Sequence, residues 1–183
     1  LVTSLREIKS KFEIDLIKHA CNITEKGFRR VLDFIKPGVW EYEIEAEITY
    51  EFIRNKSNGH AYSPIFASGK NACILHYTNN NQQCKNNDLI LMDFGAEYAN
   101  YASDLTRTVP INGRYSKRQK DIYNSVRKVM VMATEMLVTG ALLDEFNKEI
   151  GKLIESELIN LGLLTKTEVK KQPLKNPLYK KYF

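Results

Sequence analysis

The sequence contains few cysteines, and their arrangement excludes two common classes of small protein. There are three in 183 residues, at Cys21, Cys73 and Cys84. A disulfide framework needs cysteines in pairs, and a structural zinc site needs cysteines about two to four residues apart, a spacing that this chain lacks. Unpaired thiols persist in a reducing compartment, so we expect a cytoplasmic protein.

Long apolar runs and a secretory leader are also missing. No stretch approaches the roughly 18 apolar residues of a membrane-spanning helix. Residues 1–11 mix charged and apolar side chains and contain no apolar centre of a signal peptide. We therefore expect neither a membrane anchor nor a membrane partner. The chain also begins without methionine, which suggests an internal piece of a longer protein.

Acidic side chains are scarce in one place, the C-terminal stretch. The formal net charge is +5, and residues 166–183 account for it with six lysines against the single Glu168. A nucleic-acid-binding domain carries its positive charge on a folded face rather than in one terminal stretch. We therefore expect no nucleic-acid partner, and an interaction protein that uses this basic stretch is an alternative.

Several segments have the apolar periodicity of helices, with steps of three or four residues. These segments are residues 17–35, 41–55, 116–137 and 143–161. Pro37 stops the first because proline disfavours helical geometry before it and has no amide hydrogen to donate. Ser116 with Gln119 predicts a capping box, and Gly162 is a typical residue after a helix end.

The middle of the chain is strand-like. The strand-like runs are residues 62–67, 73–77, 88–94 and 101–111. The last two are joined by a short polar connection and predict an antiparallel hairpin. The order helix, helix, strands, helix, helix predicts an α+β fold in which helices cover one side of an antiparallel sheet.

Asp93 and Asp104 each interrupt an otherwise apolar strand of this hairpin. Their separation is odd, which places both on the same face of an antiparallel pair. With the turn at residues 98–99 they would face each other directly, with Cβ atoms about 4.5–5.5 Å apart. Carboxylates this close repel unless they share a proton or bind a cation, and their hard oxygens suit Mg²⁺, Ca²⁺ or Mn²⁺. Alternatively, one or both are solvated residues beside the turn.

Ordered segments surround these aspartates. Residues 91–98 read Leu-Met-Asp-Phe-Gly-Ala-Glu-Tyr, and residues 101–108 read Tyr-Ala-Ser-Asp-Leu-Thr-Arg-Thr. This set resembles the paired-aspartate signature of the pita-bread metallopeptidases. Residues 73–77 (Cys-Ile-Leu-His-Tyr), 110–115 and 119–123 are similar to the Xaa-Pro aminopeptidase (aminopeptidase P) and prolidase branch of that family. The resemblance extends from about residue 7 to residue 183.

The resemblance implies a partial pita-bread fold, the fold of creatinase and these aminopeptidases. Residues 1–183 would be the first half of a truncated catalytic domain. Family members hold two divalent metal ions, often Mn²⁺, with two aspartates, one histidine and two glutamates. The match implies that Asp93 chelates one metal and Asp104 bridges both. The other three ligands begin with a His-Gly-x-x-His motif that this sequence lacks, so we expect weak metal binding and no activity from this chain alone.

The resemblance also implies that His76 lines the substrate site and helps to stabilise the tetrahedral intermediate. The reaction implied is removal of the N-terminal residue of peptides with proline at the second position. Prolidase, which accepts dipeptides, and a non-catalytic pita-bread binding module are the alternatives.

Other expectations concern the surroundings of the site. Arg107 either supports the aspartates or lies on the surface, and His19 and His60 are structural. Half of a sheet leaves an open edge, so we expect a homo-oligomer.

Overall fold

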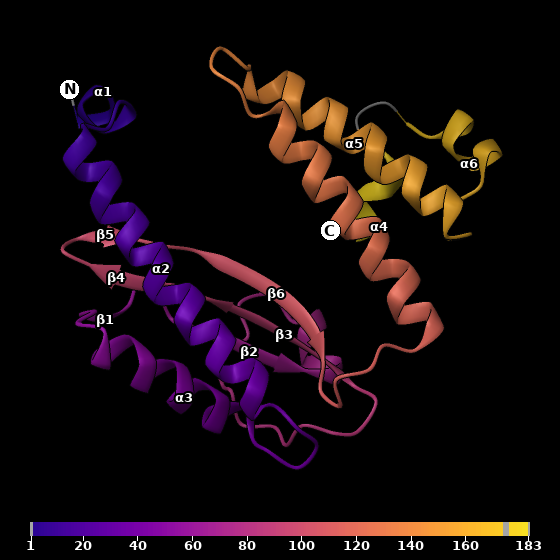
Figure 1. Ribbon diagram of the computed structural model, residues 1–183. Coiled ribbons are helices and arrows are strands. Elements are labelled where there is room, and N and C mark those ends of the chain that lie inside the picture. The colour runs from indigo at the N-terminus through magenta and orange to yellow at the C-terminus, as the bar shows by residue number, and fades with distance from the viewer. Residues whose placement is uncertain (1, 174–175, 183) are drawn as a thin grey trace. The chain divides into compact units, whose positions relative to one another are not determined.

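The structure, a computed structural model, describes residues 2–173 and 176–182. The chain divides into two compact units, with the boundary between Arg114 and Tyr115 (Figure 1). No helix in these described ranges is long and apolar enough to cross a membrane.

The first unit begins with helices: α1 (Val2–Glu7), α2 (Lys11–Phe34) and α3 (Glu41–Arg54). α2 starts at a capping box, in which the Ser10 hydroxyl accepts from the Glu13 amide and the Glu13 carboxylate accepts from the Ser10 amide. The first two predicted helices are confirmed as α2 and α3. α2 begins before the apolar stripe that identified it, because the cap satisfies its first free amides.

The strands of the first unit are short and pair antiparallel. They are β1 (Gly59–His60), β2 (Ile65–Ser68), β3 (Leu89–Phe94), β4 (Ala96–Tyr98), β5 (Tyr101–Ala102) and β6 (Leu105–Pro110). One sheet has the order β2-β3-β6, and the other has the order β1-β4-β5. β3 and β4 form one arm of a hairpin, and β5 and β6 form the other, so the predicted hairpin is confirmed.

The hairpin turns one residue later than the sequence suggested. Ala99 and Asn100 form the turn, with positive φ angles of 50° and 67°, as in tight two-residue hairpin turns. Moving the turn by one residue shifts the register by two, so Asp93 pairs with Thr106. The prediction that Asp104 lies directly opposite Asp93 was therefore wrong. The prediction that both aspartates lie on the same face of the hairpin was right, because a shift of two residues preserves the alternation of side chains.

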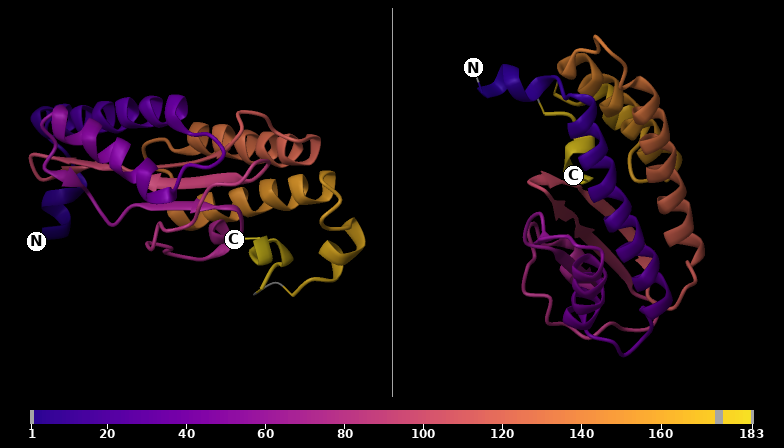
Figure 2. Two further views of the ribbon diagram at one scale, coloured as in Figure 1. Left: turned by 90° about the horizontal axis from the view of Figure 1, so that it is seen from below. Right: turned by 60° about the vertical axis from the view of Figure 1, so that its left-hand side comes forward.

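The core of the first unit lies between α2, α3 and one face of the strands (Figure 2). Along β3 the fully buried residues are Ile90, Met92 and Phe94. They pack with side chains of the two helices: Ile23, Val31, Ile44, Ile48 and Phe52. The predicted α+β fold, with helices covering an antiparallel sheet, is confirmed. Asp93 alternates with the buried residues and lies on the other face.

One predicted strand is wrong. Residues 73–77 belong to a short 3₁₀ helix, η1 (Gly69–Cys73), and to the turn that follows it. His76 in that turn has a φ of 53°, which an extended strand does not allow. Residues 69–82 therefore form a loop after β2, which we call the His76 loop.

The second unit is helical where it is described. Its elements are α4 (Lys117–Met136), α5 (Leu143–Asn160), α6 (Lys166–Lys171) and η2 (Leu178–Tyr182). The capping box of Ser116 and Gln119 at the start of α4 is confirmed. Gly162, with a φ of 70°, follows the end of α5 as predicted.

Candidate metal and active site

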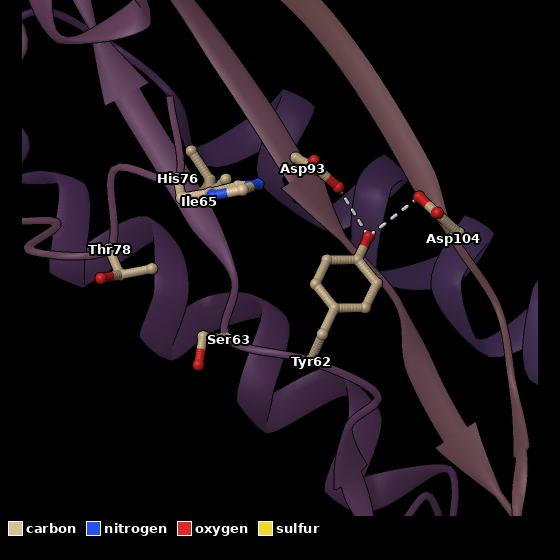
Figure 3. A pocket seen from close by; sticks show the side chains of 7 residues that line it. All are labelled: Tyr62, Ser63, Ile65, His76, Thr78, Asp93 and Asp104. Carbon is tan, nitrogen blue, oxygen red and sulfur yellow. Dashed lines mark hydrogen bonds between the residues drawn. The ribbon is translucent and has the colours of Figure 1, made fainter. Parts of the chain in front are cut away.

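Asp93 and Asp104 come from opposite arms of the hairpin and meet at one tyrosine hydroxyl. The Oη of Tyr62 lies 2.6 Å from Oδ1 of Asp93 and 3.0 Å from Oδ1 of Asp104 (Figure 3). The two carboxylate oxygens are therefore no farther apart than these two distances taken together. Tyr62 precedes β2, and the pairing of Ile65 with Asp93 brings this segment beside β3.

The Tyr62 hydroxyl offsets only part of the repulsion between the aspartates. It carries one hydrogen, so it donates fully to only one carboxylate at a time. Burial raises the pKa of Tyr62, and the hydrogen bonds and charges of Asp93 and Asp104 raise it further. The phenol therefore stays protonated at neutral pH and acts as a donor. The remaining acceptor capacity of the two carboxylates is suited to a cation.

A tight contact between the hairpin arms fixes the backbone beside Asp104. A side chain at Gly95 would place its Cβ 1.8 Å from the carbonyl oxygen of Ser103. The Ala96 amide donates to the Ser103 Oγ at 3.0 Å and to the Oγ1 of Thr24 at 2.9 Å. The hydroxyls of Thr24 and Ser103 are 2.6 Å apart. Because Thr24 lies on α2, this helix fixes residues 103–104, which separate β5 from β6 and include Asp104.

A cavity of about 400 Å³ contains the two aspartates. Its lining residues are Tyr62, Ser63, Ile65, His76, Thr78, Asp93 and Asp104 (Figure 3). His76 reaches it from the His76 loop, where its side chain is exposed. The structure therefore brings the three predicted site residues into one cavity, although they come from the His76 loop, from β3 and from the break between β5 and β6.

The cavity offers the kind of ligand that a divalent metal prefers, but it offers few such ligands. Carboxylate oxygens are the ligands that Mn²⁺ and Mg²⁺ prefer. Within residues 2–173 and 176–182, no group of three or more His, Cys, Asp or Glu side chains could hold a metal ion. Asp93 and Asp104 therefore fit part of a metal site rather than a complete one.

The structure adds one residue to the site and moves another away from it. Tyr62 was missed because its role depends on the pairing of β2 with β3, which the sequence does not specify. Arg107 is the register partner of Met92. It therefore lies on the opposite face of the hairpin from Asp93 and does not support the aspartates.

His60 is half-buried in the first unit. Its Nε2 is 2.8 Å from the Oγ1 of Thr49, and its ring centroid is 5.0 Å from that of Phe52. Thr49 donates its own hydrogen to the Glu45 carbonyl, so Nε2 is the nitrogen that carries a hydrogen and donates. Among the described residues, the buried Nδ1 has no hydrogen-bond partner. Burial lowers the pKa of His60, while the charge of Glu45 opposes this shift.

The free energy of unfolding of the first unit is expected to decrease as the pH drops below about 6.5, because of His60. The folded pKa lies below the ordinary value of about 6.5, so the contribution of the neutral ring is complete above that pH. Below it the unfolded chain binds a proton that the folded chain does not, with a slope of at most about 1.4 kcal/mol per pH unit. Urea unfolding between neutral and mildly acidic pH measures this slope. His60→Gln should reduce this slope, and an unchanged slope in a folded His60→Gln protein would contradict the prediction.

Comparison with known proteins places this geometry in a family. The sequence profile described as metallopeptidase family M24 matches residues 15–180. The Xaa-Pro aminopeptidase of Haemophilus influenzae is 41% identical over 164 residues, which are 90% of this chain and 38% of that protein. The Xaa-Pro aminopeptidase of Escherichia coli is 37% identical over 164 residues, 90% of this chain and 37% of that protein. The chain therefore spans less than two fifths of the length of these relatives.

Solved structures agree with the sequence relatives. Aminopeptidase PepP of Pseudomonas aeruginosa has a TM-score of 0.85 and 39% identity, over 87% of this chain and 36% of that one. Zinc-substituted aminopeptidase P of Escherichia coli in complex with product has a TM-score of 0.85 and 37% identity, over 88% of this chain and 37% of that one. The partial pita-bread fold and the aminopeptidase P resemblance that the sequence indicated are both confirmed.

Proposed function

Because the chain belongs to metallopeptidase family M24, we propose that it carries the first part of the active site of a metal-dependent Xaa-Pro aminopeptidase. Such an enzyme removes the N-terminal residue of peptides whose second residue is proline. The two Xaa-Pro aminopeptidase relatives support this assignment. The observation that carries it is the Tyr62 hydroxyl, which lies within hydrogen-bonding distance of both Asp93 and Asp104.

Four residues of the cavity have a role in this proposal. Asp93 and Asp104 would hold divalent metal ions through their carboxylate oxygens, with Mn²⁺ as the proposed metal. When bound, such a metal pair lowers the pKa of a water molecule and polarises the scissile carbonyl. Tyr62 holds the two carboxylates at a fixed separation. His76 donates a hydrogen bond to the substrate carbonyl oxygen as negative charge develops on it.

The proposal extends to the whole chain. Both units would belong to one catalytic domain, because the family match at residues 15–180 crosses the boundary between them. In the described sheet β6 is an outer strand, and outer strands are the places where sheets pair with another chain. We include self-association of the chain in the proposal for this reason.

The 183-residue chain alone is expected to bind Mn²⁺ weakly, with a Kd above about 10⁻⁴ M. Two carboxylates leave most of the coordination shell to water. Isothermal titration calorimetry with Mn²⁺ measures the affinity, and hydrolysis of an Xaa-Pro peptide by the purified chain should be undetectable. Two tight Mn²⁺ sites, or metal-dependent hydrolysis by the chain alone, would show that the proposed division of the site is wrong.

A longer polypeptide that contains this chain and the remaining ligands distinguishes the candidate functions. With Mn²⁺ it should cleave a tripeptide with proline at the second position and leave the matching alanine tripeptide intact. Cleavage of an Xaa-Pro dipeptide in preference to the tripeptide would indicate prolidase. Peptide binding without any cleavage would indicate a non-catalytic module and overturn the proposal.

A further inference from the structure

Glu41, the first residue of α3, carries a fully buried carboxylate. Its Oε1 accepts from the Ser68 amide and the Ser68 hydroxyl, both at 2.7 Å, and from the Asn71 side chain at 3.2 Å. Its Oε2 accepts from the Tyr77 hydroxyl at 2.8 Å and from the Gln82 amide at 2.9 Å. A carboxylate is costly to bury unless its oxygens are hydrogen-bonded, and here each oxygen has several donors.

The donors to Glu41 are spread along the loop that carries His76. Ser68 is the last residue of β2, immediately before the His76 loop, and Gln82 is the last residue of that loop. Tyr77, which is 6% exposed, is the neighbour of His76 in the sequence. One buried side chain on α3 therefore connects both ends of the loop and the position next to the histidine.

The backbone of His76 itself needs such support. Its φ of 53° lies in the left-handed region, which is strained for a residue with a side chain. Strained conformations persist only where the surrounding structure holds them in place. The hydrogen bond from Tyr77 to Glu41 fixes the residue that directly follows the strained one.

A second anchor holds a different part of the same loop. The Asn80 side chain, 3% exposed, accepts from the Phe66 amide at 2.9 Å. It donates to the Glu45 carboxylate at 2.9 Å and to the Pro64 carbonyl at 3.0 Å. This anchor attaches the loop to β2 and to α3 beyond His76. Next to His76, the Tyr77 hydroxyl binds Glu41 at 2.8 Å and also contacts Asn71 at 2.9 Å and Asn81 at 3.2 Å within the loop, so Glu41 is the partner that ties this position to α3.

We propose that Glu41 is a positioning residue for His76. By binding Ser68, Tyr77 and Gln82 at once, it fixes the His76 loop so that the His76 ring lines the cavity of the aspartates (Figure 3). The catalytic meaning of this position rests on the proposed function, whereas the position itself does not.

The substitution Glu41→Gln tests the proposal with little change in volume. Glutamine replaces one carboxylate oxygen with an NH₂ group, and each oxygen of Glu41 receives a backbone amide, from Ser68 or from Gln82. Either orientation of the glutamine amide therefore opposes a backbone N–H that cannot rotate away. We expect amide hydrogen exchange in residues 69–82 to accelerate about tenfold or more. The ring resonances of His76 in the NMR spectrum should shift and broaden as the ring samples several positions.

Two further variants make the result specific. Glu47→Gln changes a carboxylate on the same helix that pairs with Arg30, so it should leave the His76 resonances unchanged. Tyr77→Phe removes the hydroxyl next to His76, and with it the hydrogen bonds to Glu41, Asn71 and Asn81. It should shift the His76 resonances in the same direction as Glu41→Gln. If Glu41→Gln does not fold, Tyr77→Phe alone decides the matter. Unchanged His76 resonances in a folded Glu41→Gln or in Tyr77→Phe, or equal changes in Glu47→Gln, would overturn the proposal.

These readouts need neither metal nor substrate, so they separate this proposal from the proposed function. The His76 resonances could shift and broaden in Glu41→Gln while the longer polypeptide cleaves no peptide. That result would support the positioning role of Glu41 and reject the catalytic role of His76. If the longer polypeptide is active, Glu41→Gln should lower kcat about tenfold or more with a smaller change in KM, because His76 acts on developing charge. A change confined to KM would contradict that use of His76.

Discussion

Gly95→Ala is expected to prevent the first unit from folding, or to lower its free energy of unfolding by more than about 4 kcal/mol. The added Cβ would lie 1.8 Å from the Ser103 carbonyl oxygen, 2.6 Å from the Ser103 carbonyl carbon and 3.2 Å from the Asp104 amide nitrogen. All three are backbone atoms, so no rotation of a side chain relieves the overlap. The arms of the hairpin would have to separate at Asp104, immediately before β6.

The single tryptophan provides the measurement. Trp40 caps α3 in the first unit, so its fluorescence during urea unfolding follows that unit. Gly113→Ala is the matched control, because Gly113 has a φ of +73° and open space around its Cβ position. It should cost only the strain of the left-handed region, about 1–2 kcal/mol. A Gly95→Ala protein that unfolds at the wild-type urea concentration would contradict the close pairing of the hairpin arms.

The parts of the fold that local patterns determine were predictable from the sequence. Periodicity located the four long helices, and the capping box at Ser116 located the start of α4. The odd separation of Asp93 and Asp104 predicted their common face. That inference survived an error in the turn, because side-chain alternation depends on parity and not on the exact register.

The register itself was not predictable from local rules. The turn residues Ala99 and Asn100 both have positive φ, and alanine is disfavoured there. The close approach of Gly95 to Ser103, together with the hydrogen bonds of Thr24 from α2, supports this register. Those contacts join residues far apart in the sequence, so no window around the turn contains the information.

The His76 loop illustrates the same limit. Residues 73–77 have the apolar composition of a strand, yet Ile74 is 54% exposed and Leu75 is 88% exposed. The segment is held by the buried carboxylate of Glu41 on α3 rather than by neighbouring strands. A polar anchor from a distant helix leaves no periodic signal, so the sequence pattern does not indicate Glu41. Tyr62 has no such signal either, because its position depends on the pairing of β2 with β3.

Asp104→Asn is expected to stabilise the metal-free first unit by about 0.5–1 kcal/mol and to impair the site at the same time. The two carboxylates both lie beside the Tyr62 hydroxyl, which can donate to only one of them. Asparagine keeps an oxygen that can accept from Tyr62 and removes one negative charge. In the longer polypeptide the same change should weaken Mn²⁺ binding at least about tenfold, since a neutral amide is a poorer ligand for a hard cation.

A double-mutant cycle isolates the repulsion between the two aspartates. Asp93→Asn alone should also stabilise the metal-free unit, whereas adding it to Asp104→Asn should give little more, because the repulsion needs both charges. Asp33→Asn, the same change at an exposed position of α2, controls for net charge. Urea unfolding of the four proteins of the cycle measures the coupling. Additive effects, or destabilisation by either single change, would mean that the carboxylates do not repel each other and that a bound metal is not needed to offset their charges.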